Sequence, residues 1–260
     1  MQIIVTKDAE ETREAVADAI TDQIAENPGS VLALSAAPEA LAVYDVLADR
    51  YESEVLDFSR LAVFNLGEYC GVQATDPDSV YTAMRRHLYD HVNMNPEHAY
   101  VPEGMNDDAD AVCDGYEARI HLEGGIDLIA LPLGSAGELG LNVGGSEFSK
   151  ETQLVDDPRS AYTMGVGTIM EANQVVVFAN GSDMAEIVRD AFFGPVTPTV
   201  PASILQFHPD ATAIVDEAAF ECCFELVEGD DHDCDCGCDD DECCHGEHHH
   251  NGECCGKHHH

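Results

Sequence analysis

The sequence predicts an α/β protein whose parallel sheet carries helices on both faces. Short runs such as residues 31–34 (VLAL) and 174–179 (QVVVFA) are continuous in apolar side chains, which is typical of strands buried on both faces. Stretches with helical spacing separate these runs, and that alternation favours parallel strands joined by helical connections. In such folds ligands bind beyond the carboxyl ends of the strands.

Helix and strand patterns alternate through the first half of the chain. Thr6 or Asp8 can cap a first helix, and Glu11 lies in its first turn. One apolar face of that helix is formed by Val16, Ile20 and Ile24. The segments that follow are a strand at 31–34, a helix through about residue 50, a strand at 61–64 and helices near 79–92 and 109–122.

The same alternation continues towards residue 228 and then stops. Strands are expected at 127–131, 174–179 and 212–215, and a helix over 184–193 ends at Gly194-Pro195, as helices commonly do. Beyond Gly229 the apolar pattern gives way to a low-complexity sequence of Asp, Cys and His. We therefore expect a folded domain over residues 1–228 and a disordered tail over 229–260.

The charge of the chain excludes two classes of partner. There are 51 Asp and Glu residues against 11 Lys and Arg, a formal net charge of −40. Nucleic-acid phosphates and anionic membranes both require a basic face, so neither is expected to bind. Because no apolar run approaches the roughly 18 residues of a membrane span and no signal-peptide pattern is present, we expect a cytoplasmic protein. The sequence leaves open a protein partner and a homo-oligomer.

Most of the acidity belongs to the expected domain, because residues 1–228 carry a net charge of −31 and residues 229–260 carry −9. Lys is also scarce, with three residues in the whole chain. This composition resembles that of proteins from salt-in halophiles, where the Debye length falls to about 3 Å at 1 M salt and self-repulsion is screened. The alternative is an acidic protein of ordinary salt requirement. The halophile interpretation predicts a fold that loosens in low salt.

Residues 64–69 (FNLGEY) resemble the FNLDEY segment of the glucosamine-6-phosphate deaminase/isomerase family, which is related to the 6-phosphogluconolactonases. Similar blocks follow in the family's order at 165–172 (GVGTIMEA), 194–198 (GPVTP) and 201–209 (PASILQFHP). The resemblance implies a Rossmann-like fold. It also implies a reaction in which an amino-sugar phosphate is bound, its ring opens, and a proton moves between neighbouring carbons as ammonia leaves.

The catalytic positions that the resemblance implies are altered in this chain. Gly67 stands where the family has its proton-transferring Asp, and glycine carries no proton. Ala136, Glu138 and Val143 stand where the family has an Asp, the ring-opening His and the Glu that orients that His. Of these replacements Glu138 alone can titrate.

The phosphate cradle that the resemblance implies is altered as well. Residues 36–39 (AAPE) replace a Gly-containing loop, and Pro38 has no N–H while Glu39 adds negative charge. Met184 stands where the family has a phosphate-binding Lys. The lid that carries a phosphate-binding Arg is shortened, which leaves Arg159 as the one substitute.

We interpret this pattern as a catalytically degenerate member of the family, a pseudoenzyme. Glu68 and Glu138 are the remaining candidates for an acid or a base. The remnant of the pocket is expected to consist of Asn65, Gly67, Gly134, Gly137 and Asn142.

The tail is rich in metal-binding side chains, with seven Cys and eight His beyond residue 229. Thiolate and imidazole suit soft and borderline metals, so we expect Zn²⁺, Cu⁺ or Ni²⁺ as ligand and no organic cofactor. The spacing differs from that of a zinc finger or ribbon and defines no unique geometry. The expected ligands are Cys234, Cys236, Cys238, Cys243, Cys244, His245, His248, His249, His250, Cys254, Cys255, His258, His259 and His260.

Two functional hypotheses follow from the sequence. The first is a deaminase-family pseudoenzyme whose tail binds metal ions for buffering, delivery or sensing. The alternative is a glucosamine-6-phosphate deaminase, or a related sugar-phosphate isomerase, that uses altered catalytic residues such as Glu68 or Glu138.

Overall fold

A computed structural model describes residues 1–53, 56–145, 148–156 and 159–227 of the chain. The chain divides into a large compact unit, Met1–Phe224, and a second unit, Glu225–His260. The large unit contains both sheets and is described below.

The main sheet has seven parallel strands in the order β1-β10-β9-β6-β2-β3-β5. Its strands are β1 (Gln2–Thr6), β2 (Val31–Leu34), β3 (Ala62–Asn65), β5 (Ala99–Tyr100), β6 (Leu128–Pro132), β9 (Gln174–Ala179) and β10 (Ala211–Asp216). From β2 the chain moves outward through β3 to β5, and β6 then lies on the other side of β2. The carboxyl ends of β2 and β6 therefore meet where the strand order reverses, which is the usual ligand-binding place in such sheets.

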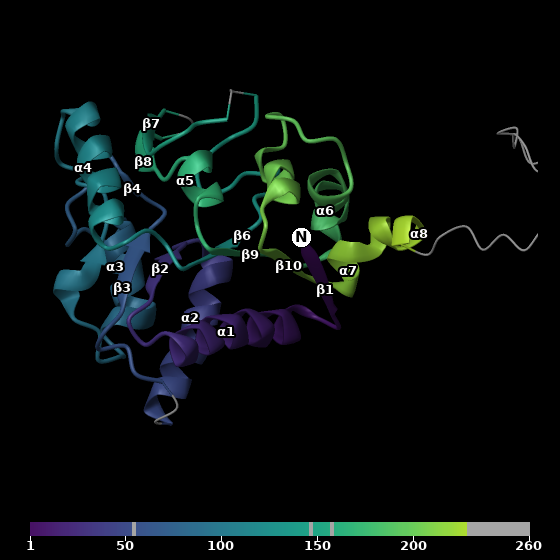
Figure 1. Ribbon diagram of the computed structural model, residues 1–260, viewed down its shortest axis with the longest axis horizontal. Helices are drawn as coiled ribbons and strands as arrows, with labels where there is room; N and C mark the ends of the chain where they lie inside the picture. The colour runs from purple at the N-terminus through teal and green to yellow at the C-terminus, as the bar shows by residue number, and fades with distance from the viewer. Residues whose placement is uncertain (54–55, 146–147, 157–158, 228–260) are drawn as a thin grey trace, which may run out of the picture. The chain divides into compact units, whose positions relative to one another are not determined.

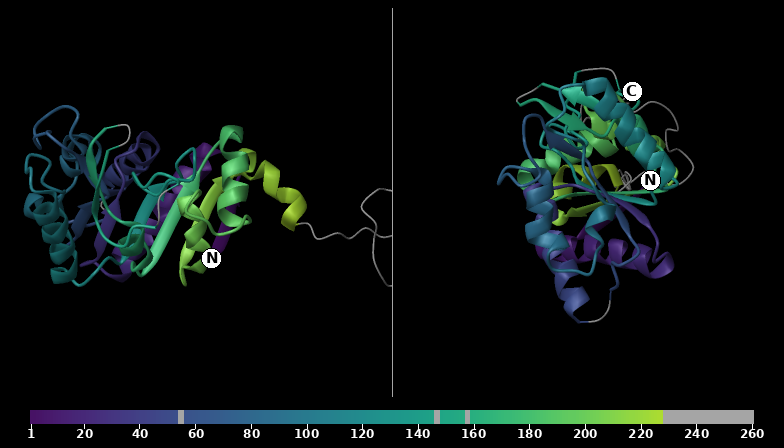
Figure 2. Two further views of the ribbon diagram at one scale, coloured as in Figure 1. Left: turned by 90° about the horizontal axis from the view of Figure 1, so that it is seen from above. Right: turned by 90° about the vertical axis from the view of Figure 1, so that its left-hand side faces the viewer.

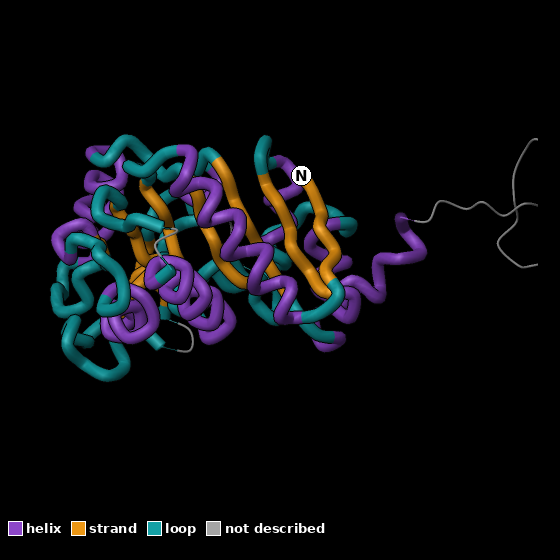
Figure 3. The backbone as a smooth tube through the Cα atoms, turned by 90° about the horizontal axis from the view of Figure 1, so that it is seen from below, coloured by secondary structure: helices purple, strands orange, loops and turns teal. Residues whose placement is uncertain are grey.

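Helices cover both faces of this sheet (Figure 1). One face carries α1 (Ala9–Glu26), α2 (Pro38–Glu52), α3 (Val80–Met84) and the π-helical turn η1 (Arg85–Tyr89). The other face carries α4 (Ala109–Leu122), α5 (Val166–Met170), α6 (Ala185–Phe192), the 3-10 helix η4 (Pro201–Phe207) and α7 (Glu217–Phe220). The end-on view in Figure 2 separates these two layers, and Figure 3 shows α1 crossing the strands on its own face.

The side chains of each strand divide between two apolar cores, as the pleat requires. Leu32 and Leu34 of β2 belong to the core under α1 and α2, whereas Val31 and Ala33 belong to the core under α4 and α6. Burial on both faces explains why the strand sequences are continuously apolar.

A second, antiparallel sheet of three strands lies beyond β3. Its strands are β4 (Gly67–Tyr69), β8 (Ala161–Thr163) and β7 (Gln153–Val155), in the order β4-β8-β7. Because Leu66 alone separates β3 from β4, the chain passes from one sheet to the other at the end of β3. This transition positions the residues that line the candidate site.

The predicted α/β fold is confirmed. Three expected elements match the observed ones at both ends: the strands at 31–34 (β2) and 174–179 (β9) and the helix at 109–122 (α4). Asp8 caps α1, since its carboxylate accepts hydrogen bonds from the amides of Glu10 and Glu11. Several features were not predicted. They include β1, whose side chains are mostly exposed at a sheet edge, the short edge strand β5, the small antiparallel sheet, the π-helical turn after α3, and the helices α5, η4 and α7.

Among the described residues, no helix combines the length and the apolar character that crossing a membrane would require. The expected cytoplasmic location and the expected dependence of the fold on salt stay predictions.

Candidate active site

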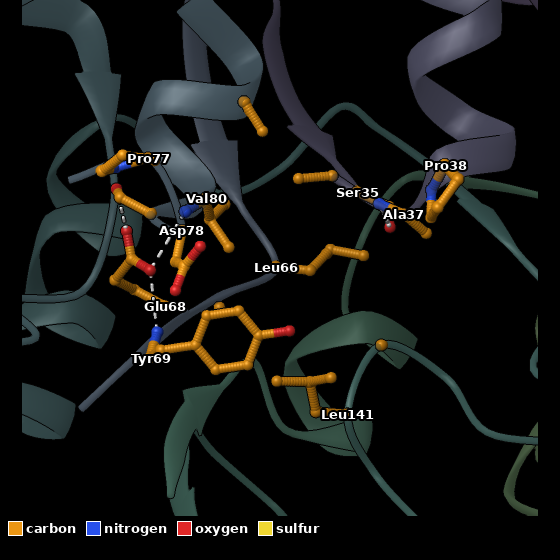
Figure 4. A pocket seen from close by; sticks show the side chains of 15 residues that line it. Ser35, Ala37, Pro38, Leu66, Glu68, Tyr69, Pro77, Asp78, Val80 and Leu141 are labelled. Carbon is orange, nitrogen blue, oxygen red and sulfur yellow. Dashed lines mark hydrogen bonds between the residues drawn. The ribbon is translucent and has the colours of Figure 1, made fainter. Parts of the chain in front are cut away.

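A cavity of about 330 Å³ opens at the carboxyl ends of β2 and β3, and we call it the β2–β3 cavity. Its volume lies at the lower end of the roughly 300–1,000 Å³ that is typical of small-molecule sites. The described residues that line it are Ser35, Ala36, Ala37, Pro38, Leu66, Gly67, Glu68, Tyr69, Pro77, Asp78, Ser79, Val80, Ala83, Gly140 and Leu141. Figure 4 shows one wall formed by Glu68 and Asp78 and the other by Ser35, Ala37 and Pro38.

Glu68 is a carboxylate whose oxygens are already engaged. Its side chain is 2% exposed and lies beside the start of α3. One oxygen accepts hydrogen bonds from the amides of Tyr69 (2.8 Å) and Val80 (3.1 Å), and the other accepts one from Ser79 Oγ (2.7 Å). Glu68 therefore fixes β4 to the N-terminus of α3, a stabilising place for a negative charge.

Asp78 is the carboxylate in the cavity wall that stays available. It is exposed, and no hydrogen bond within the described part of the chain engages its oxygens. The Tyr69 ring extends from the same wall towards Leu66 and Leu141 (Figure 4). The cavity thus offers a free carboxylate and a phenol as groups that can exchange protons.

The wall at the start of α2 offers few free donors. Ala37 N–H already donates to Ser35 Oγ (3.2 Å), and Ala40 N–H and Leu41 N–H donate to the Ala37 carbonyl (2.9 and 3.0 Å). Pro38 at the first helical position has no N–H. Between residues 36 and 40, the amides of Ala36 and Glu39 are the two without a partner among the described residues, and the altered phosphate loop stays a prediction.

Arg159 contacts Tyr69, one of the residues that line the cavity. Its guanidinium carbon is 4.3 Å from the centroid of the Tyr69 ring, which is cation–π geometry. Arg159 is exposed and is not one of the described residues that line the cavity.

Gly67 lines the cavity and lies against β8. A Cβ atom added to it would lie 2.3 Å from the carbonyl oxygen of Tyr162, closer than real Cβ contacts. The backbone pairing of Gly67 with Thr163 holds these two strands together. The glycine that replaces the family's Asp is therefore required by this backbone as well as being without a proton.

The structure brings one of the five expected pocket residues, Gly67, into the cavity lining. Asn65 is fully buried behind it, where its amide donates to the Tyr100 carbonyl and its oxygen accepts from Tyr89 Oη. Burial raises the pKa of Tyr89 well above its ordinary value.

Asn142 and the two remaining glycines serve the loop after β6. The Asn142 amide donates to the carbonyls of Leu139 (2.7 Å) and Met164 (2.8 Å), which holds this loop against the start of α5. Gly137 has a φ of +82°, a conformation that favours glycine. Gly140 and Leu141 line the cavity instead of Gly134, Gly137 and Asn142.

Glu138, the second expected acid or base, folds back on its own loop. One of its oxygens accepts a hydrogen bond from Ala136 N–H at 2.8 Å, and the side chain packs against Gly134. It does not line the β2–β3 cavity. The sequence analysis missed Asp78 and Tyr69, although both lie near the FNLGEY segment and Asp78 directly precedes the helix cap Ser79.

The expected metal ligands of the tail, from Cys234 to His260, lie outside the described residues, so the metal site stays a prediction. Within residues 1–227, apart from the three short undescribed gaps, no cluster of three or more His, Cys, Asp or Glu side chains could hold a metal ion.

A second hollow, of about 450 Å³, lies between α1 and the strands β1, β9 and β10. Its lining includes Gln174 at the start of β9 and Thr212 near the start of β10. It is therefore remote from the carboxyl ends of the strands, where parallel sheets place their chemistry.

A Rossmann-like parallel sheet with a cavity at its strand-order reversal defines a small-molecule site of the α/β class. The family described as glucosamine-6-phosphate isomerases/6-phosphogluconolactonase matches residues 6–214, and the chain belongs to this family. The chain is 38% identical to the glucosamine-6-phosphate deaminase of Pseudarthrobacter chlorophenolicus, over 84% of this chain and 91% of that protein. It is 34% identical to that of Clostridioides difficile, over 84% and 95% respectively.

Solved structures give the same result for the fold. A monomeric glucosamine-6-phosphate deaminase superposes with a TM-score of 0.82 at 28% identity, covering 85% of this chain and 100% of that one. The 6-phosphogluconolactonase of Trypanosoma brucei gives 0.70 at 19% identity, covering 85% and 97%, and at that identity it shows the fold alone.

These relatives correct the first functional hypothesis. The interpretation as a pseudoenzyme that works through a metal-binding tail is wrong, because relatives at 34–38% identity over most of the chain are named as glucosamine-6-phosphate deaminases. The comparisons favour the alternative, an enzyme of this family.

Proposed function

We propose that this protein catalyses the deaminating isomerisation of an amino sugar, the type of reaction for which its relatives are named, with Asp78 as the proton-transferring carboxylate. The single observation that carries the proposal is the free Asp78 carboxylate in the cavity at the strand-order reversal. Membership of the family supports the reaction type.

The reaction requires a base that takes a proton from C2 of the open-chain sugar and returns it to C1. The imine left at C2 is then hydrolysed by water, which supplies the ketone oxygen as ammonia leaves. Among the groups in the cavity wall, Glu68 is occupied by its hydrogen bonds to Ser79, Tyr69 and Val80. Asp78 has no such partners in the described part of the chain and is open to the cavity. The Tyr69 phenol is the neighbouring group that can donate a proton to a sugar oxygen.

The test is release of ammonia and formation of a ketose from glucosamine 6-phosphate and from glucosamine, assayed in low and in high KCl. We expect turnover of at least one of the two sugars by the unaltered chain. Loss of a positioned acid–base group typically costs about 10²–10⁴-fold in rate, so Asp78→Asn should lower turnover by that factor.

Glu138→Gln is the matched control. It removes a carboxylate of the loop after β6 that does not line the cavity. Equal losses in Asp78→Asn and Glu138→Gln would contradict the assignment of Asp78. Absence of ammonia from both sugars at every salt concentration would contradict the proposed reaction.

A further inference from the structure

We propose that the β2–β3 cavity selects an amino sugar that carries no phosphate group. This inference rests on the proposed function for the amino sugar, but the selection itself follows from the charges and donors of the cavity.

The lining offers negative charge and no positive charge. Its ionisable acids are Glu68 and Asp78, and none of the described residues that line it is Lys, Arg or His. A phosphate brings nearly two negative charges and is ordinarily met by cations or by inward-facing amides. A protonated amine brings one positive charge and is complementary to the free Asp78 carboxylate.

Backbone donors replace the missing cations only in part. At the start of α2, Pro38 lacks an N–H, Ala37 N–H is bonded to Ser35 Oγ, and Ala40 N–H is bonded to the Ala37 carbonyl. The amides of Ala36 and Glu39 are the two in this stretch without a partner among the described residues. Glu39 in the first turn adds a further negative charge beside this wall. The positive end of the helix dipole is thus directed at a wall with few free donors.

The charge of the whole chain acts in the same direction. A formal net charge of −40 concentrates cations near the surface and repels anionic ligands, more strongly at low ionic strength. The negative charge of the chain therefore attracts a cationic amino sugar, whereas it repels the phosphate group of the corresponding phosphate ester.

Arg159 is a described cation near this wall, and its guanidinium carbon lies 4.3 Å from the centroid of the Tyr69 ring. A stacked guanidinium contributes to holding the Tyr69 ring in place. Because Arg159 is not part of the lining, we expect it to make no contact with the ligand. The Arg159→Gln variant tests this expectation.

The experiment is calorimetric titration of the full chain with glucosamine, glucosamine 6-phosphate, glucose and inorganic phosphate, in low and in high KCl. We expect glucosamine to bind at least about tenfold more tightly than either glucosamine 6-phosphate or glucose, the factor that one charge-assisted hydrogen bond supplies. Asp78→Asn should remove the preference over glucose. Arg159→Gln should leave the ratio of glucosamine to glucosamine 6-phosphate affinity unchanged.

Tighter binding of glucosamine 6-phosphate, measurable binding of inorganic phosphate at the same site, or a selective loss of glucosamine 6-phosphate affinity in Arg159→Gln would each overturn the inference. So would failure of glucosamine to bind. Binding is measured without turnover, so the two proposals fail separately. Glucosamine bound with preference but never deaminated defeats the proposed function alone, whereas deamination of a preferred phosphorylated sugar defeats this inference alone.

Discussion

The backbone of Gly67 passes so close to β8 that a Cβ atom at this position would lie 2.3 Å from the carbonyl oxygen of Tyr162. Gly67 is also the position at which the family pattern places a catalytic Asp. The two facts together mean that the carboxylate cannot be restored by substitution alone, because strands β4 and β8 would have to separate.

We therefore expect Gly67→Asp to destabilise the fold and to leave the rate of ammonia release no higher than in the unaltered chain. Overpacking of this kind typically lowers the free energy of unfolding by about 1–3 kcal/mol. Urea unfolding of Gly67→Asp and of Gly67→Ala measures the effect, and both variants should lose stability because both add the Cβ atom.

Gly115→Ala is the control for the same change of backbone freedom. Gly115 lies within α4 and has no atom within 4 Å of its would-be Cβ. Replacement by Ala there should raise the free energy of unfolding by roughly 0.5–1 kcal/mol, since Gly is a poor helix former. Equal effects at positions 67 and 115 would refute the packing argument.

Glu68→Gln is expected to reduce stability, because one carboxylate oxygen that accepts hydrogen bonds becomes an NH₂ donor facing other donors. Ser79 Oγ and the amides of Tyr69 and Val80 then compete for a single acceptor. A buried donor left unpaired costs about 1–3 kcal/mol, measurable by urea unfolding at neutral pH. Glu138→Gln, which loses one bond in a more exposed loop, should change the free energy of unfolding by within about 0.5 kcal/mol. Equal losses would show that Glu68 does not anchor α3.

Stability should fall in alkali through the buried tyrosines. Burial, together with the neighbouring Tyr89, raises the pKa of Tyr44 well above its ordinary value, and the Tyr44 hydroxyl donates a hydrogen bond to the Ser35 carbonyl. Burial likewise raises the pKa of Tyr116. Below about pH 10 the phenols are protonated in both states and their contribution is fully present. Above that pH the unfolded state ionises first, so the free energy of unfolding falls as the pH rises towards the folded pKa.

Tyr44→Phe tests this dependence. The slope of unfolding free energy against pH above 10 should become shallower by up to about 1.4 kcal/mol per pH unit, the contribution of one proton. At neutral pH the same variant should lose about 1 kcal/mol with its hydrogen bond to Ser35. Parallel alkaline slopes for the variant and the unaltered chain would contradict the prediction.

Asn65→Ala should separate structure from binding. The variant leaves the Tyr89 hydroxyl without its partner in a fully buried place, and the Tyr100 carbonyl keeps only its longer bond from Tyr116 Oη (3.5 Å). We expect a loss of about 1–3 kcal/mol of stability per unpaired group and an unchanged affinity for glucosamine. Calorimetry on the folded variant checks the second part, and a loss of affinity as large as that of Asp78→Asn would place Asn65 in the site.

The pattern of apolar side chains was sufficient to predict five of the seven strands of the main sheet and its longer helices. The strands at 31–34 and 174–179 are buried on both faces, so their sequences are continuously apolar, which is typical of a parallel strand. Strand β1 lacked that signal because it lies at the edge of the sheet with Ile4 and Val5 partly exposed. The three short strands of the antiparallel sheet were too brief and too far apart in sequence to be predicted.

The site divides in the same way. The motif at 64–69 and the altered positions 67 and 136–143 are properties of the sequence, and of the five expected pocket residues Gly67 alone lines the cavity at the end of β3. The sequence could not show that the carboxylate of Glu68 is occupied by hydrogen bonds from Ser79 and the start of α3. Nor could it show that the carboxylate of Asp78, ten residues later, has no such partner among the described residues. Which of two neighbouring carboxylates faces a ligand depends on backbone direction and on the donors nearby, and these are set by the turn from β4 into α3. The sequence alone determined the family and the fold; the tertiary structure decided which charges the cavity presents, because only packing determines which polar groups are already paired.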